Sequence, residues 1–360
     1  MKQIKLFDPV VEKRDFDNVL KTISSGFWTS GSGSGQVLEF ENSFKKYIKS
    51  KSCVAVNSGT AALHLAANLS NIKGKEVILP SLSFVSTAQA ILYNGGIPVF
   101  ADIDPQTLCI DPEQIEKKIS SKTSCIIPVH FGGMPADMLQ IKKLSNQKIT
   151  LIEDAAHACG SEFYGKKIGT HSDFVCFSFH PVKNLAMPSG GLISINTGNY
   201  KEIENILKSK RWCGITNRKG TDYDVDKIGW NYYMNELSAT IGLSQLKKLE
   251  KMNKKRKKIA KIYHKELNVD KKMDYTKSCS YHLYWICVEN RELFRKTLSK
   301  KGIETGTHYK PIHKMSLFKK STKLPNTEKI SKQIVTIPIH PNLTENDIEK
   351  IITTINKFDK

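Results

Sequence analysis

The most informative stretch of this chain is Phe174-Val175-Cys176-Phe177-Ser178-Phe179-His180-Pro181-Val182-Lys183-Asn184, in which an apolar strand pattern leads into a turn that carries a lysine. A second apolar run, Ile149-Thr150-Leu151-Ile152-Glu153-Asp154, ends in an aspartate. Pyridoxal 5′-phosphate needs two groups from its protein, a lysine that forms a Schiff base and a carboxylate that pairs with the pyridine nitrogen. The two stretches therefore predict a site for this cofactor at Lys183 and Asp154. Taken singly, each residue has a plainer interpretation, as a surface lysine and as a helix-capping aspartate.

Short β-rich runs alternate with helical patterns from about residue 50 to residue 245. Strands that alternate with helices favour a mainly parallel sheet with helices on both faces. We expect buried strands at 53–56, 76–79, 98–103, 124–129, 150–154, 174–178 and 191–195, and helices at 61–67 and 88–92.

The last third of the chain has a different pattern. A long helix is predicted from Glu236 to about Leu267, with apolar residues on one face and lysines on the rest. Strands at 284–288 and 334–338 and helices at 291–301 and 345–358 follow. We therefore predict an α/β protein with a large domain over 1–245 and a smaller α+β domain over 246–360.

A glycine-containing turn, Asn57-Ser58-Gly59-Thr60-Ala61-Ala62, follows the first strand and begins a helix. A helix N-terminus binds phosphate through its free amides and its dipole, so Gly59 and Thr60 are candidate phosphate ligands, together with the hydroxyl of Ser178. An ordinary N-cap is the commoner meaning of Ser-Gly-Thr before a helix. The turn contains neither Gly-Lys-Ser/Thr nor Gly-x-Gly-x-x-Gly, the marks of the common nucleotide-binding loops.

Two residues beyond Asp154 fit the same cofactor. The small side chain of Ala156 would let an aromatic ring lie flat against the turn. His157 would reach the 3-hydroxyl of that ring or orient Asp154.

The net charge of +20 suggests nucleic-acid binding at first sight. The lysines are spread along the chain, however, and no zinc spacing, helix-turn-helix or aromatic-basic pattern accompanies them. We expect a solvated basic surface without a nucleic-acid partner, whose field attracts an anionic substrate such as a pyrophosphate ester.

The eight cysteines show no metal-ligand spacing, and no apolar run approaches the roughly 20 residues of a membrane helix. The N-terminus has no apolar signal core. We expect a cytoplasmic protein with reduced thiols and no membrane partner.

In its motifs the chain resembles the DegT/StrS family of vitamin B6-dependent sugar aminotransferases, which have the fold-type I architecture. The resemblance covers nearly the whole chain. It rests on the segments 57–62, 80–88, 153–158, 177–184, 229–236, 308–313 and 337–341. It implies a seven-stranded sheet between helices, with Lys183 as the catalytic residue.

The resemblance also implies the other contacts. Phe84 would stack on the cofactor ring opposite Ala156, and Asn231 would reach the phosphate from a second subunit, which makes a homodimer with shared active sites the catalytic unit. The sugar-nucleotide cleft would be lined by Trp28, Thr29, His308, Tyr309 and His313. The implied reaction moves an amino group from L-glutamate, or less readily glutamine, to a keto group of a nucleotide-linked sugar.

Some residues depart from the family pattern. Met187-Pro188-Ser189 stands where Gly-Glu is common, and Tyr233 stands where arginine is common. Dehydratases of the family carry a histidine at the lysine position, so Lys183 argues against that activity. Cyclitol acceptors and a non-catalytic regulatory role remain alternatives.

Overall fold

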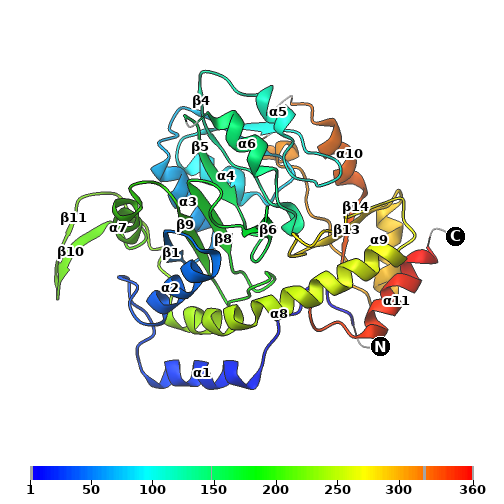
Figure 1. Ribbon diagram of the computed structural model, residues 1–360, viewed down its shortest axis with the longest axis horizontal. Coiled ribbons are helices and arrows are strands. Elements are labelled where there is room, and N and C mark those ends of the chain that lie inside the picture. Colours follow the sequence, from blue (N-terminus) through cyan, green and yellow to red (C-terminus); the bar gives the residue numbers. More distant parts are fainter. Residues whose placement is uncertain (1–2, 147, 319–321, 359–360) are drawn as a thin grey trace.

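A seven-stranded β-sheet runs through the middle of the molecule, and helices cover both of its faces (Figure 1). The computed structural model describes residues 3–146, 148–318 and 322–358. The neighbours from β8 to β3 are parallel, whereas β9 is antiparallel to both strands beside it. The predicted mainly parallel sheet is confirmed. Its spatial order is β1 (Ser52–Val56), β9 (Gly191–Ile195), β8 (Phe174–Ser178), β5 (Thr150–Asp154), β4 (Thr123–Ile126), β2 (Glu76–Pro80), β3 (Ile97–Ala101).

The strands are apolar on both sides because each side packs against helices. In β1, Val54 and Val56 belong to one buried cluster with α3, α4 and α7, whereas Cys53 and Ala55 belong to another with α2 and the start of α8. This division follows from the pleat, which turns successive side chains to opposite faces. The helices of this part are α2 (Gln36–Ile48), α3 (Gly59–Leu69), α4 (Ser86–Tyr93), α5 (Pro112–Glu116), α6 (Met138–Ser145) and α7 (Tyr200–Lys210).

The 31-residue helix α8 (Glu236–Glu266) runs along the molecule below the sheet and ends among the C-terminal elements (Figure 1). Its first half packs through Leu249 and Met252 under the sheet, and its second half packs through Ile259 and Tyr263 against the C-terminal strands. The predicted smaller α+β part is confirmed, while a boundary after residue 245 stays a prediction. This part contains β12 (Lys271–Lys272), β13 (Tyr284–Cys287), α9 (Arg291–Lys300), α10 (Pro325–Gln333), β14 (Ile334–Ile337) and α11 (Glu345–Asn356).

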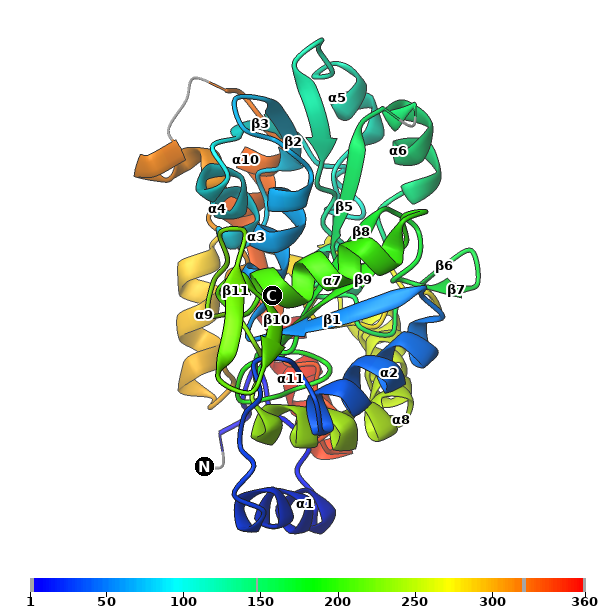
Figure 2. The same ribbon diagram turned by 90° about the vertical axis from the view of Figure 1, so that its left-hand side faces the viewer.

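Two elements that the sequence patterns did not predict project from the body. Helix α1 (Lys13–Ser24) lies on the far side of α8 from the sheet (Figure 1). The hairpin of β10 (Ile215–Lys219) and β11 (Asp222–Val225) projects from the end of the molecule that lies away from the C-terminal elements (Figures 1 and 2). A second small hairpin joins β6 (Glu162–Phe163) to β7 (Lys166–Lys167).

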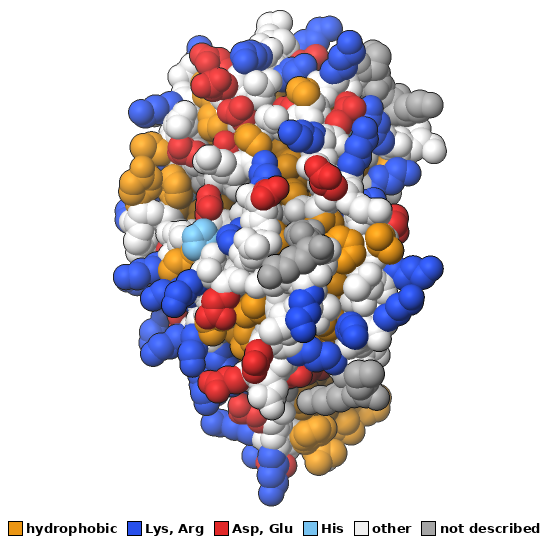
Figure 3. Space-filling view, turned by 90° about the vertical axis from the view of Figure 1, so that its right-hand side faces the viewer, with side chains coloured by type: hydrophobic (Ala, Val, Ile, Leu, Met, Phe, Trp, Pro, Cys, Tyr) orange, Lys and Arg blue, Asp and Glu red, His pale blue; other side chains and the backbone are white. Residues whose placement is uncertain are grey.

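Charged side chains of both signs share the face of the molecule that carries the C-terminal elements (Figure 3). Figure 3 shows Lys and Arg side chains interspersed with Asp and Glu over the face that carries the C-terminal elements. All eight cysteines are free thiols, and six of them are buried. None of the helices in the described part of the chain combines the length and the apolar character needed to cross a lipid bilayer.

Candidate active site

Three of the predicted segments meet at one edge of the sheet. Strands β1, β8 and β5 point in the same direction, so their carboxyl ends bring the turn after Val56, Ser178 and Asp154 to that edge. This is where open α/β sheets bind ligands. Gly59 approaches Ser178 so closely that a Cβ added to Gly59 would lie 2.7 Å from the Cβ of Ser178. The fold therefore assembles a narrow cradle from residues that are more than 100 positions apart in the chain.

The start of α3 forms one wall of the cradle. Ser58 is the N-cap, and its Oγ accepts a hydrogen bond from the amide of Ala61 at 3.1 Å. The first amides of a helix have no acceptor within the helix and carry partial positive charge. Gly59 and Thr60 stand at these positions, beside the hydroxyl of Ser178. The cradle therefore fits a phosphate group.

Asp154 is buried and held through both carboxylate oxygens. The hydroxyl of Thr87 donates to Oδ2 at 2.8 Å, and the amide of Ala156 donates to Oδ1 at 3.1 Å. Burial raises the pKa of Asp154, and these two hydrogen bonds and the nearby Lys183 oppose that rise. A buried carboxylate in this position fits a protonated ring nitrogen, which would supply the opposite charge.

Lys183 lies in a turn that backbone hydrogen bonds define. Its amide donates to the carbonyl of His180 at 2.8 Å, and the amide of Met187 donates to the carbonyl of Phe179 at 2.8 Å. The Nζ atom lies 3.5 Å from Nε2 of His282. Burial lowers the pKa of Lys183 to about 8, although the nearby carboxylate of Asp154 acts in the other direction. Near neutral pH, a minor share of this amine is therefore unprotonated and nucleophilic, but that share is far larger than for an ordinary lysine.

The lowered pKa predicts how the rate of cofactor attachment depends on pH. Only the neutral amine attacks an aldehyde, so the rate for the cofactor-free protein should rise with pH and level off above a midpoint of about 8. At pH 7 the reactive fraction is about 10%, several hundred times that of a lysine with an ordinary pKa. Stopped-flow absorbance after mixing with pyridoxal 5′-phosphate measures this profile. A midpoint near 10 would contradict it.

His157 and Tyr309 form a second side of the site. The amide of Gly132 donates to Nδ1 of His157 at 3.2 Å, so that nitrogen carries no proton. Its Nε2 then faces the hydroxyl of Tyr309 at 3.1 Å as a donor. Burial is the main cause that lowers the pKa of His157, which keeps the ring neutral. Phe84 is 55% exposed, and its ring lies 6.1 Å from that of Tyr309. An exposed aromatic ring at such an edge is suited to stacking on a bound ring.

The residues predicted for the substrate cleft fall into two groups. His308 and Tyr309 lie at the site, where His308 bonds to Oγ1 of Thr336 at 2.7 Å. His313 is completely buried, with Nδ1 2.6 Å from Oγ of Ser81. Its other ring nitrogen lies 3.4 Å from Glu328. In this chain His313 therefore anchors the segment that follows Tyr309, and its substrate contact stays a prediction.

Trp28 and Thr29 lie elsewhere, at the start of α8. The carbonyl of Trp28 accepts a hydrogen bond from the amide of Glu236 at 2.9 Å. Thr29 forms an isolated antiparallel β-bridge with Asn235. Asn231 is exposed and accepts from the side chain of Asn57 at 3.3 Å through its backbone carbonyl. The role predicted for Asn231 depends on a second subunit, and the roles of all three residues stay predictions.

The sequence patterns missed three residues of the site. Thr87 binds Asp154, His282 contacts Lys183, and Arg256 lines the space behind the lysine. Thr87 belongs to the segment 80–88 on which the family resemblance rests, so that motif was a usable signal. His282 and Arg256 have no such signal, because only the packing of α8 and of the segment before β13 against the Lys turn brings them there.

The close approach of Gly59 to Ser178 gives a test of the phosphate cradle. Gly59→Ala should raise the Kd for pyridoxal 5′-phosphate about tenfold, since the new methyl group would push α3 or Ser178 out of place. Fluorescence titration of the cofactor-free protein measures this. Gly198→Ala is the matched control, because no atom lies within 4 Å of its added Cβ. Equal affinities for the two variants would refute the cradle.

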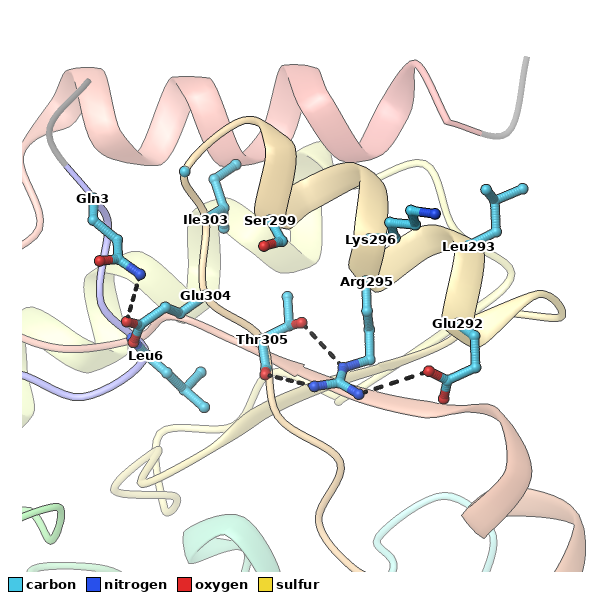
Figure 4. Close-up of a pocket in the computed structure, with 11 residues that line it drawn as sticks. Gln3, Leu6, Glu292, Leu293, Arg295, Lys296, Ser299, Ile303, Glu304 and Thr305 are labelled. Carbon is cyan, nitrogen blue, oxygen red and sulfur yellow. Dashed lines mark hydrogen bonds and ion pairs between the residues drawn. The ribbon is translucent and has the colours of Figure 1, made fainter.

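A separate hollow lies between the N-terminal segment and α9 (Figure 4). Several of its polar side chains are paired: Arg295 bonds to Thr305 at 3.3 Å and lies 4.0 Å from Glu292, and Gln3 donates to Glu304 at 2.8 Å. Lys183 and Asp154 are not part of its lining. This hollow therefore lacks the lysine and the aspartate that make the edge of the sheet the better candidate for an active site.

Comparisons with known proteins agree with this geometry. The model of the DegT/DnrJ/EryC1/StrS aminotransferase family matches residues 9–356. The chain is 31% identical to the spore coat polysaccharide biosynthesis protein SpsC of Bacillus subtilis, over 98% of this chain and 96% of that protein. It is 34% identical to the uncharacterized protein MJ1066 of Methanocaldococcus jannaschii, with the same coverage.

Solved structures show the same fold. PseC of Helicobacter pylori, an aminotransferase involved in the biosynthesis of pseudoaminic acid, superposes with a TM-score of 0.93 at 29% identity and 99% coverage of both chains. Spr1654 of Streptococcus pneumoniae, described as a sugar aminotransferase, superposes in its PMP form with a TM-score of 0.93 at 26% identity, over 99% of this chain and 97% of that one. Its PLP form has also been solved. The chain belongs to the DegT/DnrJ/EryC1/StrS aminotransferase family and has the fold-type I architecture, and its cofactor is pyridoxal 5′-phosphate.

Proposed function

We propose that the protein transfers an amino group from L-glutamate to a keto group of a sugar linked to a nucleoside diphosphate. The observation that carries the proposal is that Lys183, whose amine has a pKa lowered to about 8, lies near the buried carboxylate of Asp154, beside a phosphate cradle. The names of SpsC and PseC, which concern polysaccharide and pseudoaminic acid biosynthesis, support a sugar acceptor.

Each residue of the site has a role in this proposal. When bound, the cofactor supplies the electron sink that stabilises negative charge on the substrate carbon. Lys183 would hold the cofactor through Nζ, and the same amine would move a proton at the substrate carbon. Asp154 keeps the ring nitrogen protonated. Gly59, Thr60 and Ser178 hold the phosphate, and Phe84 and Ala156 enclose the ring. His157 donates from Nε2 toward Tyr309 and the 3-oxygen of the ring.

The net charge of the protein favours an anionic acceptor. A net charge of +20 produces a positive field, which draws a pyrophosphate-bearing substrate toward the molecule. Binding of the nucleotide part, remote from the reacting carbonyl, would position the keto group for attack. His308 and Tyr309 lie at the site and are the proposed contacts to the sugar.

We further propose that two copies form the active enzyme. Helix α1 leaves Phe16, Leu20 and Ile23 exposed at helical spacing, and Phe27 and Trp28 beside them are exposed as well. A patch of this kind is typical of an interface between chains. In the dimer, Asn231, Trp28 and Thr29 would reach the site of the partner. The free cysteines suit a reducing compartment, and we propose the cytoplasm.

A two-stage assay tests the function. In the first stage, L-glutamate or L-glutamine is added to the cofactor-loaded protein, and the visible band of the lysine-bound cofactor should disappear with glutamate. In the second stage, keto sugars linked to different nucleoside diphosphates, free keto sugars and keto cyclitols are added, and recovery of the band identifies the acceptor. Recovery only with cyclitols, or with none of these, would refute the proposed acceptor class.

A further inference from the structure

A small cavity lies behind Lys183, on the side of the N-terminal segment. Its lining includes the segments Phe7–Pro9 and Pro181–Lys183 together with Arg256, His282 and His340. The cavity offers about 10 Å³ to a water-sized sphere. That is at the lower limit of the space that one water molecule needs, and it is too small for a substrate.

Three lining residues carry a buried polar atom without a hydrogen-bond partner in the described part of the chain. These atoms are Nδ1 of His282, Nδ1 of His340 and Nη1 of Arg256. The three side chains are only 3%, 6% and 6% exposed, respectively. Buried polar groups are almost always hydrogen-bonded, so three unpaired atoms around one cavity indicate a shared ligand.

The other contacts of the two histidines determine which of these atoms donate. Nε2 of His340 lies 3.0 Å from the carbonyl of Lys5, which can only accept, so this nitrogen carries the proton and Nδ1 is an acceptor. Nε2 of His282 lies 3.5 Å from Nζ of Lys183, which donates when protonated, so the proton of His282 lies on Nδ1. Burial keeps both rings neutral, because it lowers the pKa of each. The cavity therefore presents two donors, His282 and Arg256, and one acceptor, His340.

We propose that one buried water bridges His282, Arg256 and His340, and that this water holds His282 as a hydrogen-bond acceptor for the amine of Lys183. Water accepts two hydrogen bonds and donates two, so it satisfies all three atoms. A chloride ion accepts but does not donate, and it would face the lone pair on Nδ1 of His340. Phe7 stacks on His282 at 5.6 Å and closes the cavity toward the N-terminal segment.

His282 is a positioning residue in this arrangement. Its Nε2 lies 3.5 Å from Nζ of Lys183. By accepting a hydrogen bond from this amine, His282 favours the protonated form of Lys183. In the neutral form of Lys183, the same hydrogen bond fixes the direction of the nitrogen lone pair. The other charged or titratable groups that act on this pair are Asp154, His157, His308 and Arg256. The inference rests on the proposed role of Lys183, but the water does not depend on the identity of donor or acceptor substrate.

The water is tested by crystallography of the cofactor-free protein, with and without a bromide soak. We expect one peak within hydrogen-bond distance of the three atoms and no anomalous signal at that place. An empty cavity, or a bromide peak in it, would overturn the bridging water.

The role of His282 is tested by the pH profile of cofactor attachment. His282→Phe keeps a flat ring against Phe7 but removes the acceptor, so the midpoint should fall by about one pH unit, the shift expected when a charged group loses one hydrogen bond. His282→Gln, which places an amide oxygen near the same position, should restore most of the shift. His171→Phe is the matched control, because His171 contacts Phe163 and lies outside this cluster.

The outcomes separate the inference from the proposed function. A profile for His282→Phe that matches the wild type, whatever its melting temperature, would overturn the positioning role. If the phenylalanine variant does not fold, His282→Leu takes its place with the same expected shift. If the wild-type protein did not attach the cofactor, and its spectrum matched that of Lys183→Ala, the proposed role of Lys183 would be wrong instead.

Discussion

Lys183→Ala should abolish the visible band of the bound cofactor and lower the rate of amino transfer by at least about 10⁴-fold. The variant loses both the amine that holds the cofactor aldehyde and the group that moves the proton. Absorbance spectra during titration with L-glutamate, together with single-turnover rates, measure both effects. Lys201→Ala, at an exposed position of α7, is the control and should keep the band and the rate.

The stability of this variant separates a chemical defect from misfolding. The pKa of Lys183 is lower in the folded protein than in the unfolded chain, so burial of the charged form opposes folding below about pH 8. This opposition lessens as the pH rises from about 8 toward the unfolded pKa near 10. Replacement by alanine removes that cost, and at pH 7 the melting temperature should not fall. A variant that keeps its band would show that another residue holds the cofactor.

Asp154→Asn should lower kcat by about 10²–10³-fold, the usual cost of removing one fixed group that stabilises charge in the transition state. Asparagine has the same shape but no charge, so it cannot keep the ring nitrogen protonated. In the wild type, the hydroxyl of Thr87 and the amide of Ala156 each donate a hydrogen bond to one carboxylate oxygen. Asparagine has only one side-chain oxygen, so its NH₂ group would face one of these two donors and that hydrogen bond would be lost. The Kd for the cofactor should therefore rise as well.

Steady-state kinetics and equilibrium dialysis measure the two effects of this change. Asp137→Asn is the matched control, because Asp137 caps α6 by accepting from the amide of Gln140, and asparagine caps equally well. If Asp154→Asn kept kcat within tenfold of the wild type, another group would have to balance the charge of the ring.

The strands of the sheet were predictable because their signal is local. Each is a short apolar run bounded by polar or glycine-containing turns, as in Val77-Ile78-Leu79 between Glu76 and Pro80. Helix α1 and the hairpin of β10 and β11 gave no comparable signal. Most residues of that hairpin are exposed, so no apolar alternation marks its strands. The apolar residues of α1 that do occur at helical spacing face outward rather than into the core.

The site was predictable where a residue stands at the end of a strand or in the turn that follows. Asp154, Ser178 and Gly59 owe their positions to β5, β8 and β1, and the direction of these strands brings them to one edge. The substrate residues were harder to place. His313 belongs to the same motif as His308 and Tyr309, yet its side chain turns away to Ser81 and Glu328.

Local patterns in the chain were thus sufficient for the fold class, the cofactor and the residues at strand ends, because burial and chain direction follow from short-range periodicity. The surroundings of Lys183 depend on contacts between distant segments. His282, 99 residues further along the chain, reaches the amine from the segment before β13, and Arg256 reaches the same place from α8. Such contacts arise when helices and sheets pack side chain against side chain, and no periodicity within one segment specifies which distant residue will fill a given space.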